Sequence, residues 1–220
     1  MEQAFIVPPC QQAVDILWQD EHLLLINKPS GLLSVPGKHE ANKDCVISRV
    51  QQDFPEARIV HRLDMDTSGI MVLALTADCH RALNRLFAER HVSKHYEAVV
   101  FGQCEQTAGT VELPLICDWP NRPKQKVDHE HGKAATTNYE VLSTDSTAHS
   151  SRVLLKPVTG RSHQLRVHMA AIGHPVLGCN FYAHEQAKAM APRLLLHAKT
   201  LRFSHPITAE AIKGYSPCPF

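Results

Sequence analysis

The sequence predicts a mixed α/β fold built on a largely antiparallel sheet. Segments typical of strands outnumber those typical of helices, and several neighbouring strand segments lie too close in sequence for crossover helices. Of the 220 residues, 44% are hydrophobic and 20% are charged, which allows a real core and differs from the composition of a disordered chain. We therefore expect one compact domain over residues 1–220.

The first third of the chain contains a predicted hairpin, a helix and a buried strand. Two short apolar runs, 14–19 and 22–27, flank an acidic dipeptide and predict the hairpin. Apolar spacing within 46–54 predicts a short amphipathic helix. The continuous apolar run 70–75 predicts a buried strand, and Thr76 is a candidate N-cap for the helix after it.

The remainder of the chain is richer in strand patterns. Four segments have strand composition: 96–101, 136–142, 152–157 and 194–203. Ser162 is a candidate cap for a helix whose inner side carries Leu165 and Met169, and Gly173 predicts its end. The residues after Phe203 do not show where the last strand lies.

Cysteine spacing and hydropathy predict the compartment. The seven cysteines include no CxxC pair and no Cys/His cluster of zinc-ligand spacing, so we expect reduced thiols and no structural metal. No apolar stretch approaches the roughly 18 residues of a membrane span, and the N-terminus lacks a signal-peptide pattern. These features predict a cytoplasmic protein that does not enter membranes.

The charge is unevenly distributed. The formal net charge is +1, yet residues 120–170 contain eight Lys or Arg residues and four Asp or Glu residues. A basic half is compatible with a groove that follows nucleic-acid phosphates. An ordinary solvated surface explains the same composition, and the sequence leaves both interpretations open.

The tetrapeptide His61-Arg62-Leu63-Asp64 lies at a predicted junction between a strand and a turn. The structural interpretation is that Arg62 and Asp64 form an ion pair and the Asp64 carboxylate caps the turn. The functional interpretation is an ionised Asp64 that acts as a nucleophile, because a neighbouring cation favours the charged carboxylate. Both interpretations remain open from these four residues alone.

Two further segments contain candidate functional side chains. Gly160–His168 opens a predicted helix, where Arg161, His163 and Arg166 would add to the anion-binding tendency of the helix start. Solvent-exposed polar positions are the alternative. Tyr96 begins an apolar strand, where it packs in the core or faces a cleft.

Together the segments HRLDMDTSG, KHYEAVVFG and GRSHQLRVH resemble the RluA family of pseudouridine synthases. NKPSGLLSVPG, GHPVLG and RLLLHA resemble the same family, so the likeness covers roughly residues 15–206. It implies the pseudouridine synthase fold, a bent and mostly antiparallel mixed sheet with flanking helices and a central catalytic cleft. It also implies conversion of uridine to pseudouridine in structured RNA, without metal or organic cofactor.

The resemblance implies a role for each catalytic candidate. Asp64 matches the essential aspartate of the family. The first step of the family's reaction is formation of a C1′ adduct, formation of a C6 adduct or elimination to a glycal, and the sequence leaves all three open. Tyr96 matches the tyrosine that packs on the target base, and Arg166 matches the arginine that pairs with the aspartate. Arg62 matches the residue that enters the space left by the flipped nucleotide, since the base must leave its stack.

The resemblance also implies the RNA contacts and the targets. His61, Arg161 and His163 would shape the site or meet a phosphate, and Arg122, Lys124 and Lys126 would contact the RNA backbone. CDWPNRPKQKV, at 117–127, is similar to dual-specificity members that act on the tRNA anticodon stem-loop and on 23S rRNA. We expect a monomer without the N-terminal S4-type RNA-binding domain found in many relatives.

One position departs from the family pattern, and two alternatives stay open. Cys179 stands where the family usually has aspartate, which predicts a local structural or RNA-contact change, not inactivity. One alternative is a non-catalytic RNA-binding or RNA-folding protein, which would not depend on Asp64. Another is a nucleosidase using Asp64 with His61, which would release free uracil.

Overall fold

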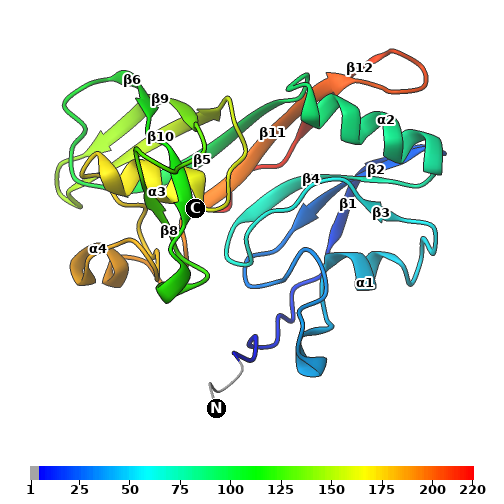
Figure 1. Cartoon of the computed structure of the whole chain (residues 1–220), viewed down its shortest axis with the longest axis horizontal. Helices are drawn as coiled ribbons and strands as arrows, with labels where there is room; N and C mark the ends of the chain where they lie inside the picture. The colour runs from blue at the N-terminus through cyan, green and yellow to red at the C-terminus, as the bar shows by residue number, and fades with distance from the viewer. Residues whose placement is uncertain (1–4) are drawn as a thin grey trace. The chain divides into compact units, whose positions relative to one another are not determined.

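The computed structural model describes residues 5–220, which form two compact units. The first unit comprises the described residues up to Lys94 together with Ala198–Pro219, and the second comprises His95–His197 with Phe220. The chain enters the second unit within β5 (Ser93–Phe101) and returns to the first within β11 (Leu196–Ser204), as Figure 1 shows by colour.

The first unit is built on an antiparallel sheet. Its strands are β1 (Asp15–Gln19), β2 (Leu23–Lys28), β3 (Arg58–Ile59), β4 (Ser68–Ala74), the end of β11, and β12 (Ala211–Tyr215). β1 and β2 form the predicted hairpin, β2 and β3 pair with β4, and β12 pairs with β11. All seven residues of β4 are buried, which confirms the predicted strand, although it begins two residues before Ile70.

Glycine is required at the start of β4. Gly69 has a φ of +118°, and a Cβ there would overlap the backbone of Ala198 in β11. A side chain at this position would therefore be strained and would separate the two strands. The sequence segment that we assigned to a turn, Ser68-Gly69, thus already belongs to the sheet.

Three helices belong to the first unit: η1 (Glu40–Asn42), α1 (Val46–Val50) and α2 (Ala77–Ala88). Thr76 Oγ1 accepts a hydrogen bond from the Cys79 N–H at 3.2 Å, which confirms the predicted cap. Cys79 and Leu83 form the buried side of α2. α1 is shorter than predicted, because the chain leaves the helix at Gln51.

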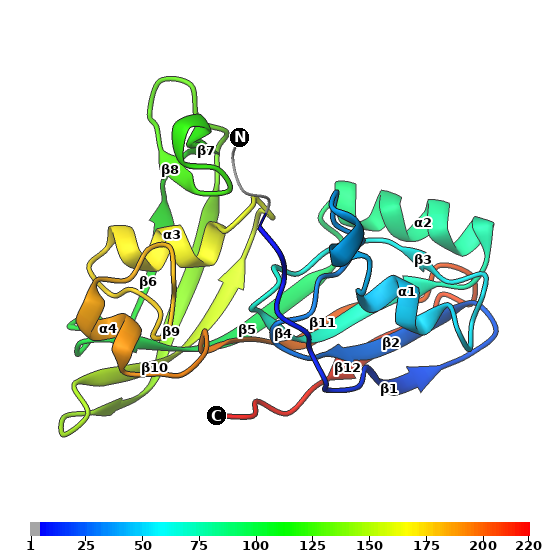
Figure 2. The ribbon, with the colours of Figure 1, turned by 90° about the horizontal axis from the view of Figure 1, so that it is seen from below.

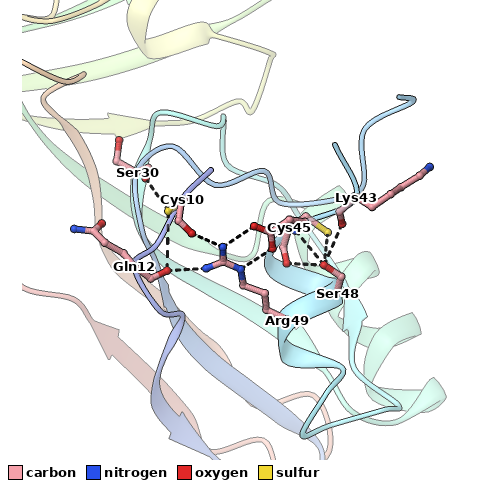
Figure 3. Close-up of polar contacts among 8 residues, drawn as sticks. Cys10, Gln12, Ser30, Lys43, Cys45, Ser48 and Arg49 are labelled. Carbon is pink, nitrogen blue, oxygen red and sulfur yellow. Dashed lines mark hydrogen bonds and ion pairs between the residues drawn. The ribbon is translucent and has the colours of Figure 1, made fainter. Parts of the chain in front are cut away.

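Arg49 of α1 ties the N-terminal segment to the first unit, as Figure 3 shows. Its guanidinium donates to the carbonyl oxygens of Cys10 and Gln12 and to both carboxylate oxygens of Asp44. The hydrogen bond from Arg49 lowers the pKa of Asp44. The Cys10 thiol in turn donates to the Ser30 carbonyl at 3.5 Å.

The second unit contains a sheet and a separate hairpin. The sheet is antiparallel throughout in the order β5, β10 (Ser150–Pro157), β9 (Thr136–Asp145) and β6 (Ala108–Glu112). The hairpin consists of β7 (Leu115–Cys117), η2 (Trp119–Asn121) and β8 (Gln125–Val127), and Figure 2 shows it standing away from the sheet of its unit. The strands β6, β7 and β8 are not among those predicted from the sequence.

Two helices, α3 (Gln164–Ala171) and α4 (Glu185–Ala189), complete the second unit. Ser162 is not the cap of α3, contrary to the sequence prediction. His163 occupies the N-cap position with a φ of +55°, and the Gln164 side chain accepts the N–H of Arg161 at 3.0 Å. The buried Gln164 side chain thus holds the segment before the helix, and within residues 5–220 no side chain forms a cap hydrogen bond at the start of α3.

The strand pairs described above are antiparallel, and the predicted mixed α/β class is confirmed. Within residues 5–220, no helix combines the length and the apolar character needed to cross a membrane. The seven cysteines are free thiols. In the same part of the chain, no cluster of three or more His, Cys, Asp or Glu residues could hold a metal ion.

Candidate active site

Asp64 lies in the first unit, in the loop between β3 and β4. Its side chain is half-buried, and its carbonyl accepts the N–H of Thr67 at 3.2 Å to close a turn. The preceding residue is fixed on both sides by Ser34, whose hydroxyl lies 2.7 Å from the Leu63 carbonyl and 3.1 Å from the Leu63 nitrogen. The half-buried Asp64 thus follows a residue whose backbone is held by hydrogen bonds.

The segment after β2 holds the other side of this loop. Lys28 is fully buried, and its ammonium donates to the carbonyls of Pro29, Leu32 and Met65 at 2.7–2.8 Å. The Met65 carbonyl also accepts the N–H of Gly31 at 2.9 Å. Three carbonyl dipoles around one buried ammonium offset part of its desolvation cost.

Four consecutive carbonyls around Asp64 are therefore hydrogen-bonded, because Ser30 Oγ donates to the Asp66 carbonyl at 2.7 Å. The sequence did not reveal the roles of Lys28, Ser30 and Ser34 in holding the Asp64 loop. Their signal was present as polar residues inside an otherwise apolar run. Such residues are expected to find hydrogen-bond partners when buried.

His61 supports the same loop from the sheet. Its Nε2 accepts the N–H of Val72 in β4 at 3.1 Å, and its ring stacks on Phe87 of α2 at 4.6 Å between centroids. Burial, with a smaller contribution from the positive charge of Lys94, lowers the pKa of His61 to about 3. His61 is therefore neutral at pH 7, and its predicted contact with RNA stays a prediction.

Arg62 follows immediately and is exposed to solvent. It stands between the anchored ring of His61 and the buried Leu63, so its backbone is fixed while its side chain extends outward. This is a suitable placement for a side chain that must enter a nucleic-acid stack. The insertion itself is not tested by the geometry and stays a prediction.

Tyr96 lies in the second unit, on β5 opposite Leu155 of β10. It is half-buried and packs against the main apolar cluster of that unit, which includes Ala98, Leu155 and Leu196. Tyr96 therefore packs on the core, and its contact with the target base stays a prediction.

Arg166 is 2% exposed and projects from α3 in the second unit. Its guanidinium carbon lies 5.2 Å from the ring centre of Phe181 and 5.3 Å from that of Tyr182. Its Nε lies 3.4 Å from the sulfur of Cys179. Cation–π contacts with two rings hold the guanidinium in place inside the unit.

Cys179 replaces the usual aspartate of the family pattern, and it contacts Arg166, a predicted catalytic residue. The replacement therefore changes the immediate surroundings of that arginine. The thiol is 1% exposed and accepts a weak hydrogen bond where an aspartate would form an ion pair with the arginine. Cys179 thus offers the Arg166 guanidinium a neutral sulfur at this position.

The remaining candidates of the third motif differ in their environments. His163 Nδ1 lies 2.5 Å from the Tyr182 hydroxyl, and its ring stacks on Phe181. Arg161 is exposed, and its Nε donates to the Ala134 carbonyl at 3.2 Å. His163 is thus part of the surroundings of Arg166, whereas Arg161 lies at the surface.

The basic candidates of the second unit cluster on the hairpin. Arg122 lies 4.9 Å from the ring centre of Trp119, which is 66% exposed. Lys126 is paired with Asp128 at 3.5 Å, and Lys124 is half-buried. An exposed aromatic ring beside cations is the combination that contacts single-stranded nucleic acid.

Comparison with known proteins identifies the family. A family model described as RNA pseudouridylate synthase matches residues 22–171. The chain belongs to this family. The chain is 56% identical over 215 residues to the "Dual-specificity RNA pseudouridine synthase RluA" of Escherichia coli (strain K12), covering 97% of each protein. It is 60% identical over 191 residues to the protein of the same name from Yersinia pestis, covering 87% of this chain and 92% of the relative.

A solved structure also supports membership of this chain in the pseudouridylate synthase family. "Human RNA Pseudouridylate Synthase Domain Containing 1" has a TM-score of 0.80 and 30% identity, covering 97% of this chain and 86% of the human chain. The predicted family, fold and enzyme class are therefore confirmed. The catalytic interpretation is favoured over the non-catalytic RNA-binding alternative.

Proposed function

We propose that this pseudouridylate synthase isomerises specific uridines in the tRNA anticodon loop and in 23S rRNA, with Asp64 as its nucleophile. The observation that carries the proposal is the loop around Asp64. Four successive backbone carbonyls are hydrogen-bonded there, while Asp64 itself is only half-buried. Such preorganisation is what a nucleophile needs.

The reaction exchanges one bond of the nucleotide for another. The C1′–N1 bond breaks, a C1′–C5 bond forms, the C5 proton leaves to water and N1 gains a proton. Asp64 supplies the carboxylate that forms and releases an adduct, and Tyr96 contacts the target base. Arg166 supplies a buried cation that contacts the rings of Phe181 and Tyr182 in its own unit.

The remaining candidates bind RNA in this proposal. Arg62 occupies the space left by the flipped nucleotide, and the hairpin residues Arg122, Lys124 and Lys126 contact phosphates. Arg161 is placed at the surface for a similar contact. The proposed dual specificity is supported by the name of the Escherichia coli relative, which matches over 97% of both chains. We further propose that the protein acts as a monomer in the cytoplasm.

Tritium release tests the proposal directly. Unmodified tRNA and 23S rRNA transcripts labelled with tritium at uracil C5 are incubated with wild type and with Asp64→Asn. We expect release by wild type and a loss of more than about 10⁴-fold in Asp64→Asn, because the nucleophile is removed. Asp66→Asn, a carboxylate two residues away in the same loop, is the matched control and should retain most activity.

Three other outcomes would contradict this proposal. Free uracil among the products would indicate a nucleosidase. Tight RNA binding without any release would indicate a binding protein. Equal losses in Asp64→Asn and Asp66→Asn would show that the loop needs its carboxylates only for structure.

A further inference from the structure

Tyr182 touches both the basic hairpin and the surroundings of Arg166. Its ring lies 5.3 Å from the guanidinium carbon of Arg166, while its hydroxyl accepts the backbone N–H of Gln125 in β8 at 2.8 Å. The same hydroxyl lies 2.5 Å from Nδ1 of His163 at the start of α3. One side chain therefore joins three segments that are far apart in sequence.

The directions of these hydrogen bonds follow from the groups involved. The Gln125 N–H can only donate, so the Tyr182 oxygen is its acceptor. The tyrosine proton is then available to donate to Nδ1 of His163 in the tautomer whose Nδ1 carries no proton. In this arrangement the hydroxyl uses both its donor and an acceptor position, and the contacts depend on its orientation.

His163 contributes a second, independent observation. Its φ of +55° lies in the left-handed region, which a non-glycine residue adopts at a cost unless its surroundings hold it there. Its ring is held by stacking on Phe181, at 5.7 Å between centroids, and by the bond to Tyr182. Backbone strain of this kind is concentrated at functional sites.

The hairpin also rests on α3 through apolar contacts. Leu115 and Val127 of the hairpin pack in a small cluster with Val167, the residue after Arg166, and with Tyr182. Apolar contacts are non-directional, so they hold the hairpin on the helix without fixing its angle. The hydrogen bond from Gln125 to Tyr182 adds a directional contact at β8, beside the one between His168 Nε2 of α3 and the Leu113 carbonyl just before β7.

We propose that Tyr182 is a positioning residue that couples RNA contact at the β7–β8 hairpin to the placement of Arg166. The inference rests on the proposed function and deepens it. RNA bound at Arg122 restrains the hairpin, the hairpin restrains the Tyr182 hydroxyl through Gln125, and the Tyr182 ring restrains the guanidinium. Part of the binding energy at the hairpin is thereby used to order the catalytic cation.

Tyr182→Phe isolates this coupling because it keeps the ring and removes only the hydroxyl. Tyr139→Phe is the matched control, since Tyr139 is also half-buried against the main cluster of the second unit and no hydrogen bond of its hydroxyl is recorded among the described residues. At saturating RNA, we expect Tyr182→Phe to lower the single-turnover rate of tritium release about tenfold. Its Kd for the transcript should change less than about twofold, and Tyr139→Phe should match wild type.

A double-mutant cycle separates coupling from general damage. Arg122→Gln should lower both the RNA affinity and the saturating rate in wild type. In the Tyr182→Phe background, it should lower only the affinity. The proposal would be overturned if the rate effects of Arg122→Gln and Tyr182→Phe simply multiplied in the double variant. It would also be overturned if Tyr182→Phe and Tyr139→Phe had identical rates. Thermal unfolding of each variant shows that the compared proteins are folded.

A readout without chemistry keeps this inference distinct from the proposed function. The chain has two tryptophans, so Trp18→Phe leaves Trp119 on the hairpin as a single fluorophore. Tyr182→Phe should increase the local mobility of Trp119 in time-resolved anisotropy, whereas Tyr139→Phe should not. Unchanged mobility would refute the coupling. Failure of wild type to release tritium would instead refute the proposed function.

Discussion

His61 illustrates how a single residue acquires a role different from the one its motif suggests. Beside Asp64 in sequence, it is a natural candidate for acid–base chemistry or RNA contact. In the structure its Nε2 accepts a backbone N–H from β4, and its ring is stacked on α2. Buried acceptors of this kind must stay unprotonated, so the folded state holds His61 neutral.

We predict that His61 makes the folded state less stable in acid. Its folded pKa of about 3 lies below the ordinary value of 6.5, so the unfolded chain takes up a proton first. Stability should be fully present above pH 6.5 and decline between pH 6.5 and 3, by at most about 1.4 kcal/mol per pH unit from this group. Denaturant unfolding of His61→Gln should show a weaker decline over this range. The variant His129→Gln, which replaces an exposed histidine, should lose stability with falling pH as wild type does. If the free energy of unfolding fell in parallel for wild type and both variants, His61 would not be the group responsible.

At the scale of elements, α3 is positioned by a buried polar network. Gln164 is 3% exposed, accepts from Thr159 Oγ1 and the Arg161 N–H, and donates to the Thr136 carbonyl and Thr137 Oγ1. His168 continues the network to Thr137 and to the Leu113 carbonyl near the hairpin. The helix that carries Arg166 is therefore oriented by directional bonds as well as by apolar packing.

Gln164→Leu should loosen α3. The substitution leaves buried polar partners unsatisfied, which costs about 3 kcal/mol of folding stability. Chemical denaturation should show this loss, while Gln186→Leu on the exposed side of α4 should cost less than about 0.5 kcal/mol. Similar losses in the two variants would mean that the Gln164 network contributes little.

At the scale of the whole molecule, a net charge of +1 conceals a local concentration of cations. On the hairpin, Arg122 is exposed and Lys124 half-buried, whereas Lys126 is already paired with Asp128. Electrostatic attraction to RNA therefore depends on where the cations lie and which of them are already paired, and net charge does not reveal either.

Salt dependence of RNA binding measures this contribution. The affinity for a tRNA transcript should fall steeply with added salt, because phosphate contacts release counterions. The double variant Arg122→Gln with Lys124→Gln should reduce the slope of log K against log salt by about 1.4. The paired control Arg202→Gln with Lys213→Gln, two exposed cations opposite each other on β11 and β12, should leave the slope unchanged. A flat wild-type response would exclude the hairpin as a phosphate contact.

The sequence by itself determined the fold class, the buried strand β4, the capped helix α2, the family and its candidate site residues. Hydrophobic runs, caps and contiguous motifs are local patterns, which a linear reading detects. Only the tertiary structure decided that Lys28, Ser30 and Ser34 hold the Asp64 loop and that Tyr182 joins the hairpin to α3. Those hydrogen bonds link residues 19 to 57 positions apart, and no periodicity encodes such partners.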